Sequence, residues 1–345
     1  MTGSLQATLN RTATNADAGI AHPEISYAEA LNQGLRQAME LSDSVVVLGQ
    51  LVDYAPGVFG STTGLVERFG PDRVRDFPVS ESAMTAAGIG AAVVGLRPVL
   101  VHHRLDFMIY SIDAIVNWMS LWRFKSNTQS SLPVVIRAIV GRGWGQGPQH
   151  SKSLHAWFAH VPGLNVVMPA TAFDAKGLLL ESIFGENPVI MIEHRSLFGL
   201  KDRVPAMPYR VRFGQAALRR TGRDVTLVAV GVMVPFALRV AAQLDAQGVD
   251  SEVIDLRTVS PLDFETVCAS VEKTGRLVVL DPSWGSFGVA AEIVATVAER
   301  QGRRLLADPI RIAFPDSHTP MSSALEDAYY PKEGEAASRI RRLFA

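Results

Sequence analysis

Short apolar runs alternate with helix-forming segments along most of the 345-residue chain. The apolar runs predict buried strands at residues 45–48, 98–103, 134–140, 166–168 and 189–193. Helices are predicted between them, near residues 82–94, 111–125 and 172–184. Strands that alternate with helices form a parallel sheet that is covered by helices on both faces. The first part of the chain is therefore predicted to have an α/β fold.

The same alternation starts again after residue 210. Strands are predicted at residues 224–230, 252–256 and 276–281, and helices at 235–247, 261–273 and 289–301. Residues 201–210 carry charges and two prolines without periodicity, which is typical of a linker. A length of 345 residues suits two cores. We expect a mobile N-terminal tail at 1–24, a first domain at 25–200 and a smaller α/β domain at 211–345.

Composition restricts the kind of partner. The chain has 33 Lys and Arg against 34 Asp and Glu, a net charge of −1, which argues against a nucleic-acid or membrane surface as its main partner. Cys268 is its only cysteine and cannot form an internal disulfide. A reducing compartment, the cytoplasm, is therefore expected.

An acid stands where an extended segment meets a predicted helix. Glu81 follows Pro78–Ser80 and precedes a run of small residues that extends to Gly95. Taken alone, this acid fits two explanations: a charge that stabilises the amino end of the helix, or a carboxylate placed in a site.

Two more segments carry residues suited to chemistry. Residues 105–110 follow the strand that starts at Pro98, and ligands bind at the carboxyl ends of strands in open α/β sheets. Residues 141–151 contain four glycines within seven positions and then His150, but match neither a dinucleotide-binding motif nor a P-loop.

Together these segments resemble the β subunit of the thiamine-diphosphate-dependent 2-oxoacid dehydrogenases, which belong to the transketolase-like superfamily and act on pyruvate, branched-chain 2-oxoacids or acetoin. The resemblance runs from about Ile25 to the C-terminus. The matching segments include residues 27–32, 57–60, 69–74, 78–83, 112–117, 148–151, 156–163, 174–177, 253–258, 260–263, 273–278 and 324–328. It implies a pyrimidine-binding domain followed by a transketolase C-terminal-type domain.

The resemblance also implies roles for single residues. Glu81 corresponds to the acid that faces the aminopyrimidine ring of the cofactor, and Phe107 to the aromatic residue that packs on that ring, although Phe107 also fits an ordinary core position. His150 corresponds to a histidine used in acyl transfer to a lipoyl group. Gln50 stands where the family usually has a glutamate that is thought to relay protons between paired sites, and an amide cannot titrate.

Further implications concern partners and metals. The sequence has no Gly-Asp-Gly, the start of the superfamily's Mg²⁺ and diphosphate motif. A separate α chain is therefore expected to supply the diphosphate and Mg²⁺ ligands, in an α2β2 assembly. The resemblance also places a structural monovalent cation such as K⁺ at Val134, Ser182, Ile183, Gly185 and Asn187, and Gly185 lacks the carboxylate that is usual there.

The segment His102-His103-Arg104 replaces a mostly apolar stretch of the family. These basic groups suggest an anionic or polar substrate, or a contact with the partner chain. Two enzyme hypotheses follow: a dehydrogenase component that passes the acyl group to a lipoyl acyltransferase, or a two-chain transketolase-like carboligase with no lipoyl step. A non-catalytic partner subunit is the third and least favoured.

Overall fold

A computed structural model describes residues 21–344, which form two compact units. The first contains residues up to Val140 together with Trp157–Phe213, and the second contains Gly141–Ala156 together with the chain from Gly214 onward. Most of the predicted mobile tail, residues 1–24, lies outside the described residues.

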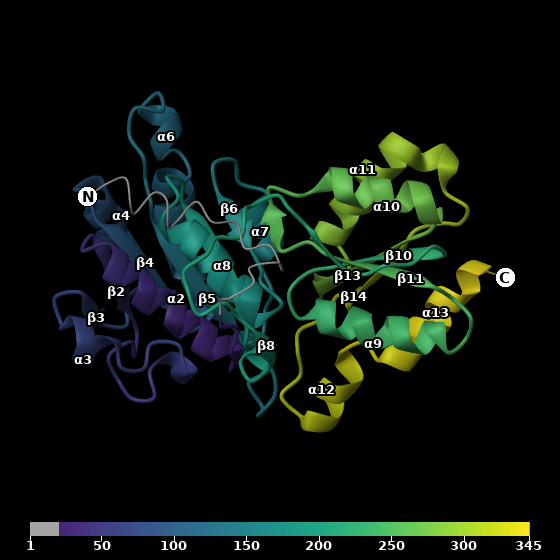
Figure 1. Ribbon diagram of the computed structural model, residues 1–345, viewed down its shortest axis with the longest axis horizontal. Helices are drawn as coiled ribbons and strands as arrows, with labels where there is room; N and C mark the ends of the chain where they lie inside the picture. Colours follow the sequence, from purple (N-terminus) through teal and green to yellow (C-terminus); the bar gives the residue numbers. More distant parts are fainter. Residues whose placement is uncertain (1–20, 345) are drawn as a thin grey trace. The chain divides into compact units, whose positions relative to one another are not determined.

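A parallel sheet organises the first unit (Figure 1). Its strands lie in the order β6-β7-β5-β4-β2-β3. They are β2 (Val45–Gly49), β3 (Val74–Asp76), β4 (Arg97–His102), β5 (Val135–Val140), β6 (Asn165–Val167) and β7 (Val189–His194). All neighbouring pairs are parallel, so the predicted α/β fold with a parallel sheet is confirmed.

Helices of the first unit pack closely on this sheet and on one another. They include α2 (Tyr27–Leu41), α3 (Leu65–Phe69), α4 (Glu81–Val93), α5 (Leu105–Met108), α6 (Trp122–Lys125) and α8 (Ala172–Ile183), while α7 (His155–Ala159) follows the glycine-rich loop. A Cβ atom at Gly88 of α4 would lie 2.7 Å from both δ-carbons of Leu100 in β4. The small residues of α4 therefore permit its close approach to the sheet. A separate antiparallel pair joins β1 (Glu24–Ser26) to β8 (Lys201–Arg203).

The helix predicted at residues 111–125 is interrupted. A short turn at Ile109–Ser111 and a π-helix at Ala114–Met119 precede α6. The Ser120 N–H donates to the Ile115 carbonyl five residues back, and the Ser120 hydroxyl donates to the Val116 carbonyl at 2.7 Å. These bonds widen the helix locally, which a periodicity argument does not detect.

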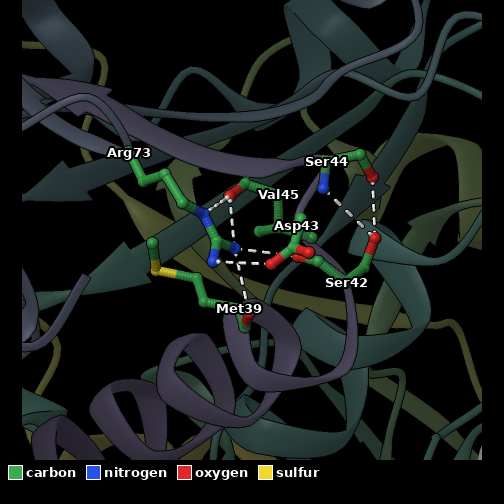
Figure 2. A network of polar contacts seen from close by, with 6 residues as sticks. All are labelled: Met39, Ser42, Asp43, Ser44, Val45 and Arg73. Carbon is green, nitrogen blue, oxygen red and sulfur yellow. Dashed lines mark hydrogen bonds and ion pairs between the residues drawn. The ribbon is translucent and has the colours of Figure 1, made fainter. Parts of the chain in front are cut away.

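The connection from α2 to β2 is held by one guanidinium (Figure 2). Arg73 donates through Nη2 to the carbonyls of Met39, Ser42 and Val45, at 2.8–3.0 Å, and its Nη1 lies 3.4 Å from the Asp43 carboxylate. Carbonyls at the end of a helix lack intrahelical partners, and a cation there satisfies them.

A smaller sheet forms the second unit (Figure 1), in the order β14-β13-β10-β11-β9. Its strands are β9 (Ala217–Arg220), β10 (Val225–Ala229), β11 (Ser251–Asp255), β13 (Leu277–Trp284) and β14 (Ile310–Phe314). The short strand β12 (Thr258–Ser260), which follows β11 in the chain, is not part of this sheet. Helices α10 (Phe264–Thr274) and α11 (Val289–Gln301) cover one face. Helices α9 (Met233–Asp245) and α13 (Glu333–Arg341) cover the other, and α12 (Ser323–Tyr329) precedes α13. None of the helices described is long and apolar enough to cross a membrane.

A buried ion pair crosses the core of the first sheet. Arg137 on β5 donates through Nε and Nη2 to the two oxygens of Glu193 on β7, at 2.6 and 2.9 Å, and both side chains are fully buried. Nη2 also donates to Ser61 Oγ at 3.0 Å. Removing one partner of such a pair leaves the other charge unpaired in the core.

We predict that Glu193→Gln lowers the free energy of unfolding by about 3–5 kcal/mol, because Arg137 is left buried beside a neutral amide. Urea denaturation of the purified chain measures this. The control is Glu265→Gln, which breaks the exposed pair between Arg300 and Glu265 and should cost less than about 1 kcal/mol. Equal losses for both variants would contradict the prediction.

Candidate functional site

One edge of the first sheet gathers polar residues from separate strands. Because β2, β4, β5 and β7 are parallel, their carboxyl ends share this edge. Gln50 follows β2, His103 and Arg104 follow β4, and Arg195 follows β7. Ligands of open α/β sheets bind at such an edge.

Glu81 and Gln50 meet directly. Glu81 is the first residue of α4, is 7% exposed, and accepts a hydrogen bond of 3.2 Å on Oε1 from Nε2 of Gln50. Gly49 brings β2 close enough for this, since a Cβ atom there would lie 2.8 Å from Cβ of Val101. Among the described residues, Oε2 of Glu81 has no hydrogen-bond donor. A buried carboxylate with one oxygen fixed and the other available can bind a ring nitrogen of a ligand.

His102 faces the interior. It is 1% exposed, and its Nε2 lies 3.2 Å from Oγ1 of Thr85, which in turn donates to Oγ of Ser111 at 2.9 Å. Burial lowers the pKa of His102 to about 3. The ring is therefore neutral at physiological pH and does not act as a cationic group.

His103 and Arg104 lie around the ring of Phe59 instead. The His103 and Phe59 ring centres are 5.0 Å apart, and the Arg104 guanidinium lies 5.4 Å from the centre of the Phe59 ring. Phe107 follows in the first turns after β4 and is half-buried. The structure thus brings Gln50 and Glu81 into contact and places His103, Arg104 and Phe107 at the same sheet edge, whereas His102 lies in the core.

His150 belongs to the second unit, on the glycine-rich loop. It is half-buried, and its carbonyl accepts the N–H of Gly141 at 2.9 Å. A Cβ atom at Gly141 would lie 2.5 Å from that carbonyl, so glycine is needed for this closure.

The loop is anchored to elements near the end of the chain. The guanidinium of Arg142 lies 3.8 Å from the ring centre of Tyr330, and the N–H of Gly143 donates to Oε1 of Glu326 at 2.8 Å. A few residues on, His155 Nε2 lies 2.9 Å from Oδ1 of Asp281, both fully buried. These contacts fix both sides of the segment that carries His150.

The positions assigned to a monovalent cation are occupied by arginine contacts. Nη1 of Arg97 donates to the carbonyls of Ile183 and Gly185, at 2.9 and 2.7 Å, and Nη2 pairs with Glu186 at 2.8 Å. Oδ1 of Asn187 accepts from Arg123 at 2.6 Å.

The other two predicted positions are also engaged. The Val134 carbonyl accepts the N–H of Val189, and the Ser182 hydroxyl donates to the Leu178 carbonyl. Arg97 thus supplies the positive charge that the carboxyl end of α8 attracts. A cation at these positions would compete with the contacts that Arg97 and Arg123 make to Ile183, Gly185 and Asn187, and the cation site stays a prediction.

Sequence reasoning missed Thr85, Phe59 and Arg195. A signal existed for Arg195, because the charged run Glu193-His194-Arg195 ends a buried apolar strand. No comparable signal marks Thr85, which lies inside a run of small residues.

The two α/β units, with a buried acid held at the carboxyl edge of the first sheet, are those of a thiamine-dependent enzyme chain of the transketolase class. Residues 23–201 match the pyrimidine-binding domain of transketolase, and residues 214–335 match its C-terminal domain. A solved structure described as a split-gene transketolase, inactive beta4 tetramer, superposes with a TM-score of 0.76 at 21% identity, over 92% of this chain and 98% of that one. At that identity the likeness shows the fold alone.

Closer relatives specify the family. The chain is 41% identical to the acetoin:2,6-dichlorophenolindophenol oxidoreductase subunit beta of Cupriavidus necator, over 92% of this chain and 97% of the relative. It is 38% identical to the 2-oxoisovalerate dehydrogenase subunit beta of Bacillus subtilis, over 91% and 98%. It is 36% identical to the pyruvate dehydrogenase E1 component subunit beta of the same organism, over 93% and 98%.

The chain therefore belongs to the β subunits of thiamine-diphosphate-dependent 2-oxoacid dehydrogenases. The resemblance drawn from the sequence is confirmed, and the dehydrogenase hypothesis fits these relatives better than the carboligase hypothesis.

We predict that His102 makes the fold sensitive to acid. The unfolded chain binds a proton at the ordinary pKa of 6.5, whereas the folded chain does so only near about 3. The contribution of His102 to stability is thus complete above pH 6.5 and is lost as pH falls toward 3.

His102→Gln should therefore lose stability less steeply over this range, by roughly 1.4 kcal/mol per pH unit. Urea melts between pH 4 and 6.5 measure the slope. His160→Gln, at an exposed histidine, should keep the wild-type slope. Identical slopes for all three proteins would refute the assignment.

Proposed function

We propose that this chain is the β subunit of a two-chain 2-oxoacid dehydrogenase that removes carbon dioxide from a 2-oxoacid and passes the acyl group to a lipoyl domain. The observation that carries the proposal is the buried Glu81 carboxylate, oriented by Gln50 at the carboxyl edge of a transketolase-type sheet. Relatives matched over nearly their whole length support it.

Thiamine diphosphate, when bound, supplies an electron sink for decarboxylation. The residues present fit its pyrimidine end, because Glu81 is a buried residue whose Oε2 accepts no hydrogen bond from the described residues. Oε2 of Glu81 would hold and exchange a proton with a ring nitrogen, and Phe107 would offer an aromatic face to the ring. General acid–base residues of this kind need a fixed orientation as well as a titratable group.

Gln50 supplies the fixed orientation of Glu81, and Glu81 supplies the titratable group. The Gln50 amide fixes Oε1 of Glu81 but does not titrate. Protons therefore reach Glu81 without passing through residue 50. We propose Gln50 as a residue that positions Glu81.

An α chain completes the site in this proposal. Diphosphate and Mg²⁺ would bind to the α chain, since this sequence lacks the Gly-Asp-Gly that begins their motif. An α2β2 assembly in the cytoplasm and a lipoyl acyltransferase partner complete the proposal. His150 would exchange a proton during acyl transfer, on a loop held by Glu326 and Tyr330.

Co-expression with an α-type chain tests the function. The heteromer should decarboxylate a 2-oxoacid and acylate a lipoyl domain, while the isolated β chain should do neither and should bind thiamine diphosphate poorly. His150→Ala should spare decarboxylation measured with an artificial electron acceptor but abolish lipoyl acylation. A heteromer that ignores every lipoyl domain and joins an aldehyde to the substrate carbon would instead establish the carboligase alternative.

We expect Glu81→Gln to lower the rate of cofactor activation by about 10²- to 10⁴-fold, because the amide keeps the shape but cannot exchange a proton. Hydrogen–deuterium exchange at the cofactor's thiazolium carbon measures activation. The matched control is Glu67→Gln, which removes an exposed acid from the first turn of α3. If both variants activate the cofactor like wild type, Glu81 is only a helix-end charge.

A further inference from the structure

Two guanidiniums converge on one aromatic ring at the carboxyl edge of the first sheet. The Cζ atoms of Arg104 and Arg195 lie 5.4 and 4.6 Å from the centre of the Phe59 ring. Arg195 also lies 5.4 Å from the centre of the Phe198 ring, and His103 packs on Phe59. We call Phe59, His103, Arg104 and Arg195 the Phe59 cluster.

The backbone around Phe59 is strained. Phe59 has φ 58° and Val58 has φ 37°, in the left-handed region that side chains other than glycine rarely adopt. Strained backbone of this kind is found most often where a ligand binds. The ring in turn holds two cations near each other.

Arg104 carries a charge that no ion pair among the described residues neutralises. It is 8% exposed, and no carboxylate among the described residues lies within ion-pair distance of it. Its hydrogen bonds use Nη1 alone, to the carbonyl and ring of His103, while Nε is buried without an acceptor. Burial lowers the pKa of Arg104, Asp106 raises it, and the charge of Arg195 lowers it further. Buried charges are normally paired.

An anion bound between the two arginines would stabilise their buried, neighbouring charges. It would offset their repulsion and give Arg104 the acceptor that it lacks, and guanidinium binds carboxylate and phosphate with strong, directional hydrogen bonds. The cluster lies at the edge that also holds Glu81 and Gln50, because its residues follow β2, β4 and β7.

The carboxylate that departs as carbon dioxide does not suit this position. A fixed cation on that group would stabilise the ground state more than the transition state, in which its charge disperses, and would slow the reaction. The arginines suit a charged group that remains on the substrate.

We propose that Arg104 and Arg195 form a subsite for a second anionic group, a carboxylate or a phosphate, on a substrate larger than a simple aliphatic 2-oxoacid. This inference depends on the proposed function only for the reaction, not for the binding of the anion. It makes Arg195, together with Arg104, a determinant of substrate specificity.

The test compares matched substrates on the heteromer saturated with thiamine diphosphate and Mg²⁺. One pair is a 2-oxo dicarboxylate and its distal amide, and a second is a phosphorylated 2-oxoacid and its unphosphorylated alcohol. Wild type should prefer the anionic member in at least one pair, which also identifies the group. Arg195→Gln should reduce that preference by about 10- to 100-fold in kcat/KM, with little change for the neutral member.

Arg104→Gln should act in the same direction, and Arg195→Gln keeps the test available if Arg104→Gln does not fold. The control is Arg68→Gln, since Arg68 is exposed and lies 5.6 Å from the Phe69 ring. It should leave the preference unchanged. Equal kcat/KM for charged and neutral members in wild type overturns the proposal. So does weaker cofactor or α-chain binding in Arg195→Gln without a change in preference.

A binding measurement separates this inference from the proposed function. Inorganic phosphate or malonate, at constant ionic strength against chloride, should raise the melting temperature of the full-length chain. The rise should persist in Arg68→Gln and disappear in Arg195→Gln. If no 2-oxoacid is turned over but this pattern holds, the proposed function fails and the subsite stands. If anions stabilise wild type and Arg195→Gln alike, the subsite is wrong.

Discussion

Parallel pairing of β2, β4, β5 and β7 determines where chemistry can occur in the first unit. It brings the carboxyl ends of four strands to one edge, so Gln50, Arg104 and Arg195 approach that edge from distant parts of the sequence. Helix α4 begins with Glu81, and the glycines at 49 and 88 let β2 and α4 pack closely enough for the Gln50–Glu81 hydrogen bond. The parallel pairing of the strands therefore determines which side chains can meet at this edge, and their chemistry determines what they can bind.

Elements with a strong apolar pattern could be predicted from the sequence. The central strands of the first sheet differ from their predicted bounds by a residue or so, and α11 matches the prediction at 289–301, because continuous apolar runs and helical spacing are local signals. The capping box of Ser26 and Glu29 at the start of α2 is a local signal of the same kind. The short strands β3 and β9 and the π-helix at 114–119 were not predicted, since they depend on distant partners or on single hydrogen bonds.

The site was less accessible to sequence reasoning than the fold. Glu81 stood out by its position, but its proposed role came from the resemblance, and its hydrogen bond to Gln50 became visible only in the structure. The glycine-rich loop was expected to belong to the first domain by its place in the chain. Its anchors, Glu326 and Tyr330, lie more than 180 residues away in sequence, and no local pattern reports such contacts.

The basic residues at the end of β4 are divided between the core and the Phe59 ring. Successive side chains of a strand point to opposite faces, so His102 enters the core, where burial keeps it neutral beside Thr85. His103 and Arg104 instead reach the ring of Phe59. From the sequence alone, His102, His103 and Arg104 are treated as one basic group with a single function. Because His102 is neutral, His103 and Arg104 are the residues of this basic segment that remain to act at the Phe59 ring.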